Sequence, residues 1–97
     1  MLDQHVRPHP DVVDTELEAG ETVLLHLAST TYYSLNPTGT CIWQGLKQGL
    51  SLREVSQRLQ GRFVVEAEQA GQSVRAFVDE LVQHQLVQRQ EGQATER

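Results

Sequence analysis

The side chains that could carry metal chemistry are few, and their spacing argues against a metal site. The four histidines stand at His5, His9, His26 and His84. Only the first two have the i, i+4 spacing of ligands on one helix face, and Pro8 between them disfavours a helix there. The sequence also lacks the cysteine pairs and the H-E-x-x-H pattern that mark zinc sites. We therefore expect no bound metal and no cofactor.

The single cysteine is the second candidate for chemistry. Cys41 falls in the first turns of an expected helix, where a thiol can be activated. It is followed directly by Ile42 and Trp43, which begin an apolar stripe, and a buried free cysteine behaves as a small hydrophobe. We interpret Cys41 as structural and keep a thiol-transfer role as an alternative. One cysteine excludes an intramolecular disulfide and fits a reducing compartment.

Other catalytic patterns are missing from the sequence. The segment TGT at residues 38–40 is not a phosphate-binding loop, because no lysine follows it. Asp79 and Glu80 are adjacent, so on a helix their carboxylates point apart. No serine, histidine and aspartate stand out as a triad. The sequence predicts a protein that is not an enzyme.

The charge and hydropathy of the sequence argue against nucleic acid and membranes as partners. The net charge of −5 opposes binding to nucleic acid, which requires a basic face. Basic residues of one expected helix could still face DNA, so a winged-helix nucleic-acid-binding protein is the alternative hypothesis. The N-terminal segment has no apolar signal-peptide core, and no run approaches the roughly 18 apolar residues of a membrane span. We expect a cytoplasmic protein without a membrane partner.

Apolar periodicity predicts three short strands followed by three helices. The strands are expected at 12–17, 22–28 and 32–35, with Val13 and Leu17 on one face of the first strand and Asp14 and Glu16 exposed. The helices are expected at about 37–49, 51–61 and 67–85. Residues 1–11 and 89–97 are expected to be flexible tails around one domain at 12–88. The predicted fold class is α+β, a winged helix-turn-helix type in which the helices cover one face of an antiparallel sheet.

Local signals define the joints between these elements. Asn36 can cap the first helix, with Pro37 at its first position. Ser51 and Glu54 form a capping box for the second helix. Gly45 lies inside the first helix, where we expect close packing against a neighbour.

Two tyrosines lie in the last strand, which is expected to form one edge of the sheet. Tyr32 and Tyr33 alternate in direction, so one packs inward and the other can face a ligand. Sheet edges accept additional strands, and tyrosine offers apolar area with a hydroxyl group. Alternatively both rings cover the core and the edge is idle, and the residues alone favour neither interpretation.

Three linked segments resemble the PqqD family of peptide-recognition domains. They are LLHLASTTYYSLNPTGTCIW at 24–43, SLREVSQRL at 51–59 and SVRAFVDELVQHQLV at 73–87. The resemblance implies a non-catalytic domain that binds the leader segment of a ribosomally synthesised precursor peptide. The leader would add to the third strand, pack on the third helix and be presented to a modifying enzyme, either a protease, a cyclase or a radical SAM enzyme. The implied leader-binding residues are Thr31, Tyr32, Tyr33, Ser34, Val74, Arg75, Val78 and Val82.

The sequence departs from the family pattern at three positions. Thr30 and Gln85 stand where the family usually has glycine, and Ser73 stands where aspartate is common. The resemblance does not decide between pyrroloquinoline quinone assembly and the maturation of lasso peptides or other peptides. The LNPTG segment at 35–39 favours the lasso-peptide relatives. An open sheet edge also permits a strand-exchanged homodimer.

Overall fold

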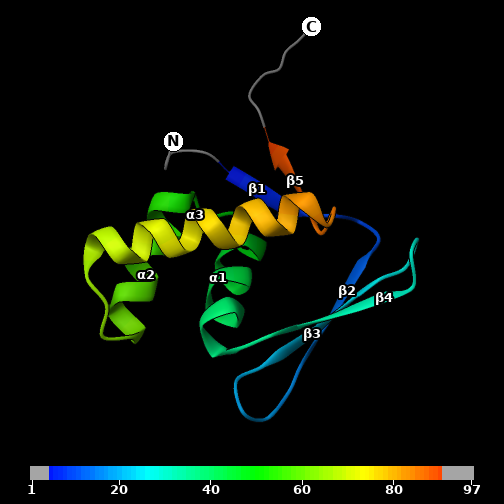
Figure 1. Cartoon of the computed structure of the whole chain (residues 1–97), viewed down its shortest axis with the longest axis horizontal. Helices are drawn as coiled ribbons and strands as arrows, with labels where there is room; N and C mark the ends of the chain where they lie inside the picture. The colour runs from blue at the N-terminus through cyan, green and yellow to red at the C-terminus, as the bar shows by residue number, and fades with distance from the viewer. Residues whose placement is uncertain (1–4, 91–97) are drawn as a thin grey trace, which may run out of the picture.

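The computed structural model describes residues 5–90, with side chains up to residue 88. In this part of the chain, four strands are followed by three helices and a last short strand, as Figure 1 shows. Their bounds are β1 (His5–Pro8), β2 (Val12–Glu16), β3 (Thr22–His26), β4 (Thr31–Leu35), α1 (Pro37–Lys47), α2 (Leu52–Arg62), α3 (Ala67–Gln83) and β5 (Val87–Gln90).

The main sheet is an antiparallel meander in the order β2-β3-β4. Leu24 of β3 pairs with Asp14 of β2 on one side and with Tyr33 of β4 on the other. The three helices lie together beyond one face of this sheet, and α3 runs across α1 and α2 (Figure 1). This arrangement confirms the predicted α+β class, with a three-stranded sheet followed by three helices.

The predicted helix joints are confirmed. The Asn36 side chain accepts a hydrogen bond from the Gly39 amide at 2.8 Å, and Pro37 occupies the first turn of α1. Ser51 and Glu54 form both bonds of the capping box at the start of α2. Such caps satisfy backbone donors that have no partner inside the helix, which is why they define a helix start so sharply.

A second small sheet corrects the prediction of two tails. β1 and β5 pair antiparallel, with Val6 opposite residue 89 and Pro8 opposite Val87. Val6 is only 1% exposed, so this segment belongs to the core. Pro8 does not prevent the strand because it stands at its end, where a missing N–H is tolerated. The prediction of a tail is therefore wrong for residues 5–8 and 89–90, while residues 1–4 and 91–97 lie outside the described part.

The sheet also presents its faces in the opposite sense to the prediction. Thr22, Leu24 and His26 of β3 are buried toward the helices, whereas Val13 is 47% exposed and Leu27 is 54% exposed. The inner face is mixed, since Leu24 and Leu35 join the core while Asp14 and Thr22 find polar partners on α1. The result is an apolar outer face made by residues of all three strands.

The core lies between α1, α2, α3 and the β1-β5 pair. Its largest fully buried side chains are Trp43, Leu24, Ile42, Leu46, Leu59 and Leu86. Gly45 packs closely as predicted, since a Cβ atom there would lie 2.9 Å from Val55 Cγ2. No helix among residues 5–90 is long and apolar enough to cross a membrane.

Candidate functional site

The outer side of β4 is a free sheet edge in the described part of the chain. β4 pairs with β3 along Thr31–Leu35, and no other described strand neighbours it. An edge strand directs alternate backbone N–H and C=O groups outward, so it can hydrogen-bond to a further strand. The edge runs directly into α1 through the Asn36 cap, which fixes the direction in which β4 leaves the sheet.

A groove of about 310 Å³ lies beside the end of this strand, between β4, the start of α1 and one flank of α3. The apolar part of its lining comes from Leu35, Ile42 and Phe77. The remaining lining residues are polar or small, and they are Ser34, Asn36, Thr38, Gly39, Ser73 and Glu80. An apolar floor with a few polar groups at the rim is the usual composition of a binding site.

The α3 flank that borders the groove is defined by helical spacing. Ser73, Phe77 and Glu80 recur at i, i+4 and i+7, which places them on one side of the helix. His84 comes one turn later, and its ring centroid lies 5.1 Å from that of Tyr33 in β4. Contacts with β4 therefore extend along this flank to the end of α3.

Gly39 sets the depth of the groove where α1 meets α3. A Cβ atom at this position would lie 3.1 Å from Phe77 Cζ, closer than most side chains tolerate. A larger residue would have to displace the Phe77 ring, and both residues line the groove.

Tyr32 and Tyr33 point to opposite faces of the sheet, as the alternation of side chains along a strand predicts. Tyr33 is half-buried against the core and His84, whereas Tyr32 is 68% exposed on the outer face of the sheet. Thr31 and Ser34 are exposed on the same strand. The structure thus brings the four residues predicted on β4 together along one free edge.

The four residues predicted on α3 do not border this edge. Val74 is 0% exposed and Val78 is 1% exposed, so both are core residues without surface for a ligand. Arg75 and Val82 lie on the opposite flank of α3 from Phe77. The set implied by the family resemblance thus contains two residues that the core buries and two that face away from the groove.

The wall of the groove is instead made by Ser73, Phe77 and Glu80, none of which was in the predicted contact set. One signal could have found them. These residues adjoin the buried stripe on the side that leads to His84, and one aromatic residue among polar ones marks a boundary between core and surface.

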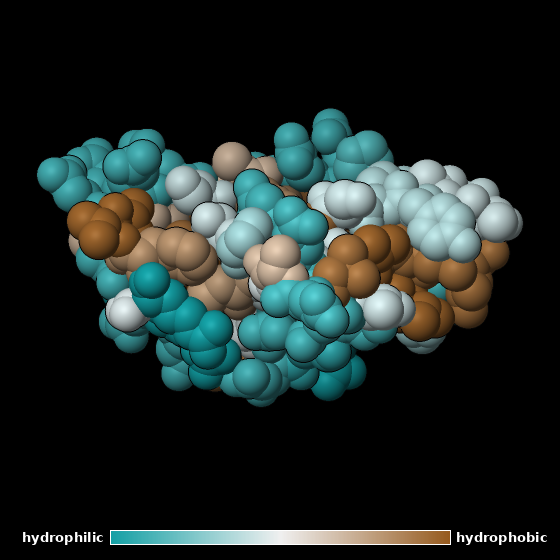
Figure 2. Space-filling model, turned by 90° about the horizontal axis from the view of Figure 1, so that it is seen from below, coloured by the Kyte–Doolittle hydropathy of each residue, from teal (hydrophilic) through white to brown (hydrophobic). Residues whose placement is uncertain are grey.

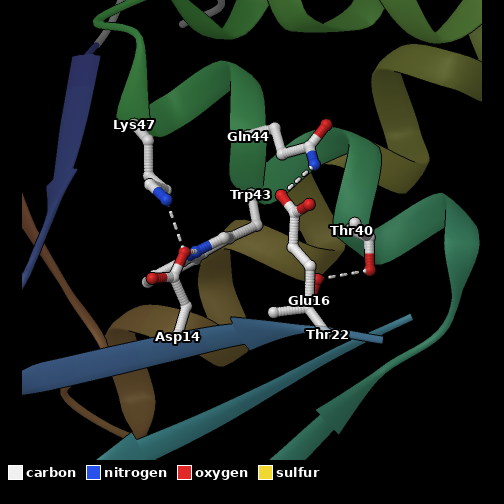
Figure 3. A network of polar contacts seen from close by, with 7 residues as sticks. All are labelled: Asp14, Glu16, Thr22, Thr40, Trp43, Gln44 and Lys47. Atoms are coloured by element: carbon white, nitrogen blue, oxygen red, sulfur yellow. Dashed lines mark hydrogen bonds and ion pairs between the residues drawn. The ribbon is translucent and has the colours of Figure 1, made fainter. Parts of the chain in front are cut away.

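A polar network orients the sheet against α1 (Figure 3). Asp14 accepts hydrogen bonds from Trp43 Nε1 at 2.9 Å and from Lys47 Nζ at 2.6 Å. On the same face Gln44 donates to Glu16, and Thr40 donates to Thr22 at 3.0 Å. These contacts hold β2 and β3 at a fixed angle to α1, and β4 with them.

The Trp43 and Lys47 contacts also change the acidity of Asp14. Partial burial by itself would raise the pKa of Asp14, but the hydrogen bonds from Lys47 and Trp43 and the Lys47 charge outweigh it. The pKa of Asp14 is consequently lowered from its usual value of 3.8.

The described residues offer little for catalysis. In residues 5–90 no three histidine, cysteine, aspartate or glutamate side chains gather as metal ligands. Cys41 is buried within α1, 3% exposed, among the core residues.

Comparison with known proteins identifies the family. The sequence profile of the family described as coenzyme PQQ synthesis protein D (PqqD) matches residues 21–87, more than half of the chain. The chain belongs to the PqqD family. The match begins just before β3 and ends at the first residue of β5, so it includes the β4 edge, the groove and all three helices.

Two solved structures are similar to this PqqD-family chain over nearly their whole length. The first is TbiB1 in complex with the TbiA(beta) leader peptide, with 28% sequence identity, a TM-score of 0.79, and coverage of 92% of this chain and 99% of that one. The second is a lasso peptide synthetase B1 complexed with the leader peptide, with 30% identity, a TM-score of 0.78, and coverage of 86% and 96%. No curated protein sequence matches the chain.

Proposed function

We propose that this protein is a non-catalytic recognition domain that binds the leader segment of a ribosomally synthesised precursor peptide. The observation that carries the proposal is the free β4 edge lying beside the groove. The two similar structures support it, because both are complexes with a leader peptide. The second of them is a lasso peptide synthetase B1, and on this ground we assign the chain to lasso-peptide maturation rather than to pyrroloquinoline quinone assembly.

The leader binds as an additional strand on β4. Its backbone pairs with Thr31–Leu35, which supplies affinity that depends little on side-chain identity. Because side chains alternate along a strand, every second leader residue faces the helices and the others face the outer side of the sheet. Selectivity arises from the first set, which enters the groove.

The groove favours an apolar leader residue with a donor group beside it. Leu35, Ile42 and Phe77 provide the apolar contact surface, and the Glu80 carboxylate at the rim accepts hydrogen bonds. We therefore replace Val74 and Val78 in the proposed contact set by Ser73, Phe77 and Glu80. Arg75, on the far flank of α3, contacts only a leader that crosses the helix.

The apolar outer face of the sheet is the proposed docking surface for the modifying enzyme. Val13, Leu27 and Tyr32 are well exposed there, and Val23 and Leu25 are partly exposed. Figure 2 shows this apolar area over the sheet at the right of the view. A bound leader strand would extend the same face beyond Tyr32, so the enzyme would meet protein and leader side by side.

Calorimetric titration with the leader of the precursor encoded beside this gene tests the proposal. We expect a Kd in the micromolar range or tighter that changes little between low and physiological salt. Gly39→Val, which fills the groove, should weaken binding about tenfold or more, because one apolar side chain loses its site. If the wild-type chain does not bind this leader, or binds duplex DNA with a steep salt dependence, leader recognition is not its function.

A further inference from the structure

The groove beside β4 continues into a second hollow of about 260 Å³ at the junction of α2 and α3. The two share Thr38 and Ser73 in their linings, so they form one continuous surface. We call the second hollow the flank pocket. Its other lining residues are Leu59, Phe63, Val64, Val65 and Gln69.

The flank pocket is chemically simpler than the groove. Its lining contains four apolar side chains and no charged one, whereas the groove contains Glu80. Leu59 at its base is 2% exposed and belongs to the core. An apolar cavity of about 150 Å³ is enough to bind benzene. The flank pocket, at 260 Å³, therefore has room for one aliphatic or aromatic side chain.

Val64 at the rim of the flank pocket is exposed like a residue in an isolated chain. Its relative exposure of 108% is the highest among the large exposed apolar side chains of the described residues. It follows Phe63, whose extended backbone ends α2. Figure 2 shows apolar surface over this α2–α3 connection at the left of the view, separated from the sheet by polar surface. Exposed apolar side chains beside an uncharged hollow, lined by apolar residues together with Thr38, Gln69 and Ser73, are typical of a surface that a partner covers.

We propose that the flank pocket binds one apolar side chain of the leader, contributed by the residues that leave the sheet at the Leu35 end of β4. The inference rests on the proposed function, and it adds a second anchor outside the strand-paired segment. The direction follows from the fold. At the Leu35 end, β4 turns into α1, so a strand added to its edge leaves the sheet over Thr38 and Ser73 and reaches Leu59 and Val64 next.

The direction of the leader strand decides whether the residue that enters the flank pocket, which we call the anchor, lies before or after the paired segment in the leader sequence. In an antiparallel arrangement with β4, the anchor precedes the paired segment in the leader sequence. In a parallel arrangement it follows that segment. In both cases its side chain is apolar and uncharged, as the lining requires.

The test combines leader variants with a protein variant that cannot disturb the core. The probe is the synthetic leader of the precursor encoded beside this gene. Each apolar leader residue before or after the strand-paired segment is replaced in turn by alanine. Val64→Asp places a charge at the pocket rim on a fully exposed residue, and Gln60→Asp adds the same charge on an exposed position of α2 outside the pocket. Binding constants are measured by calorimetry for every pair.

We expect one flanking alanine to weaken binding about tenfold. Val64→Asp should weaken the unmodified leader similarly, and Gln60→Asp should leave its Kd within twofold. The two losses should not add, because a leader that lacks the anchor no longer depends on the pocket. If the leader binds and Gly39→Val weakens it, but no flanking alanine and no Val64 change matters, the flank pocket is not a leader site and the proposed function survives. If the wild-type chain does not bind the leader, both proposals fail.

Discussion

The side chain of Asp14 is the point at which a single residue links the sheet to α1. Because its folded-state pKa lies below the value of 3.8 in an unfolded chain, the ionised form stabilises the fold. This contribution is complete above pH 3.8 and is lost as the pH falls through the folded-state pKa. We expect the free energy of unfolding to fall in that window in the wild-type chain and to fall less in Asp14→Asn.

The pH dependence of the free energy of unfolding in Lys47→Met tests whether Lys47 is the cause of the lowered pKa of Asp14. Removing the Lys47 cation should flatten the pH dependence in the same window, since that residue supplies both a hydrogen bond and a charge to Asp14. Chemical unfolding at a series of pH values measures this. Two variants with the wild-type pH profile would show that Asp14 does not link acidity to stability.

Two residues occupy backbone conformations that favour glycine. Thr30 has a φ of 56° and Gln85 a φ of 60°. Both are positions at which the sequence resemblance led us to expect glycine. Gln85 follows the last turn of α3, where the Leu86 amide donates to the Leu81 carbonyl at 2.8 Å. This is the C-terminal turn that glycine completes without steric cost. Thr30 and Gln85 therefore both carry the strain of a left-handed backbone.

Gln85→Gly should raise the free energy of unfolding by about 0.5–1 kcal/mol, because relief of the left-handed conformation exceeds the added chain entropy. Gln72→Gly is the matched control on the exposed side of α3. There the same change should lower stability by about 1 kcal/mol. Urea unfolding compares the two, and equal effects would mean that position 85 is not strained.

At the scale of the secondary-structure elements, α1 approaches α2 closely at Gly45. Gly45→Ala improves helix propensity by about 1 kcal/mol. The added methyl group would nevertheless lie 2.9 Å from the buried side chain of Val55, which has little freedom to move. We expect a net loss of about 1 kcal/mol or more in the free energy of unfolding.

Gly61 in α2 is the matched position, since a Cβ atom there meets no atom within 4 Å. Gly61→Ala should stabilise the protein by up to about 1 kcal/mol, through propensity alone. Thermal unfolding of both variants provides the comparison. A stabilised Gly45→Ala protein would contradict the close approach of α1 and α2.

The helices and the β4 edge could be predicted from the sequence because their signals are local. Asn36, Pro37, Ser51 and Glu54 act within one turn of the helix ends they define. The facing of the sheet could not be predicted in this way. Asp14 looked exposed because carboxylates usually are, and its partners Trp43 and Lys47 lie 29 and 33 residues later in the chain.

The same limit explains the other differences. β1 and β5 are four residues each and come from opposite ends of the chain, so neither has a local signal strong enough to predict their pairing. On α3 the apolar period correctly predicts the buried stripe with Val74 and Val78. It cannot tell which flank of that stripe faces β4, and the groove residues Ser73, Phe77 and Glu80 depend on that choice.

For the whole molecule, the proposed docking of the modifying enzyme on the apolar outer face of the sheet can be tested separately from leader binding. Val13→Lys and Leu27→Lys change exposed positions on that face, so each should alter stability by no more than about 0.5 kcal/mol. We expect both variants to keep the wild-type Kd for the leader but to slow leader-dependent processing by the modifying enzyme. Gln57→Lys on α2 is the control with the same charge change. Unchanged processing rates in both variants would remove the outer face as the docking surface.

The central claim is that the leader pairs with β4 as a strand, and a backbone N-methyl scan of the leader tests it most directly. Each methyl group removes one amide donor and leaves the side chain in place. Over the residues opposite Thr31–Leu35 we predict losses of about tenfold in affinity at every second position, and small effects between them. Affinities that fall without this alternation, or that do not fall at all, would contradict strand addition at the β4 edge.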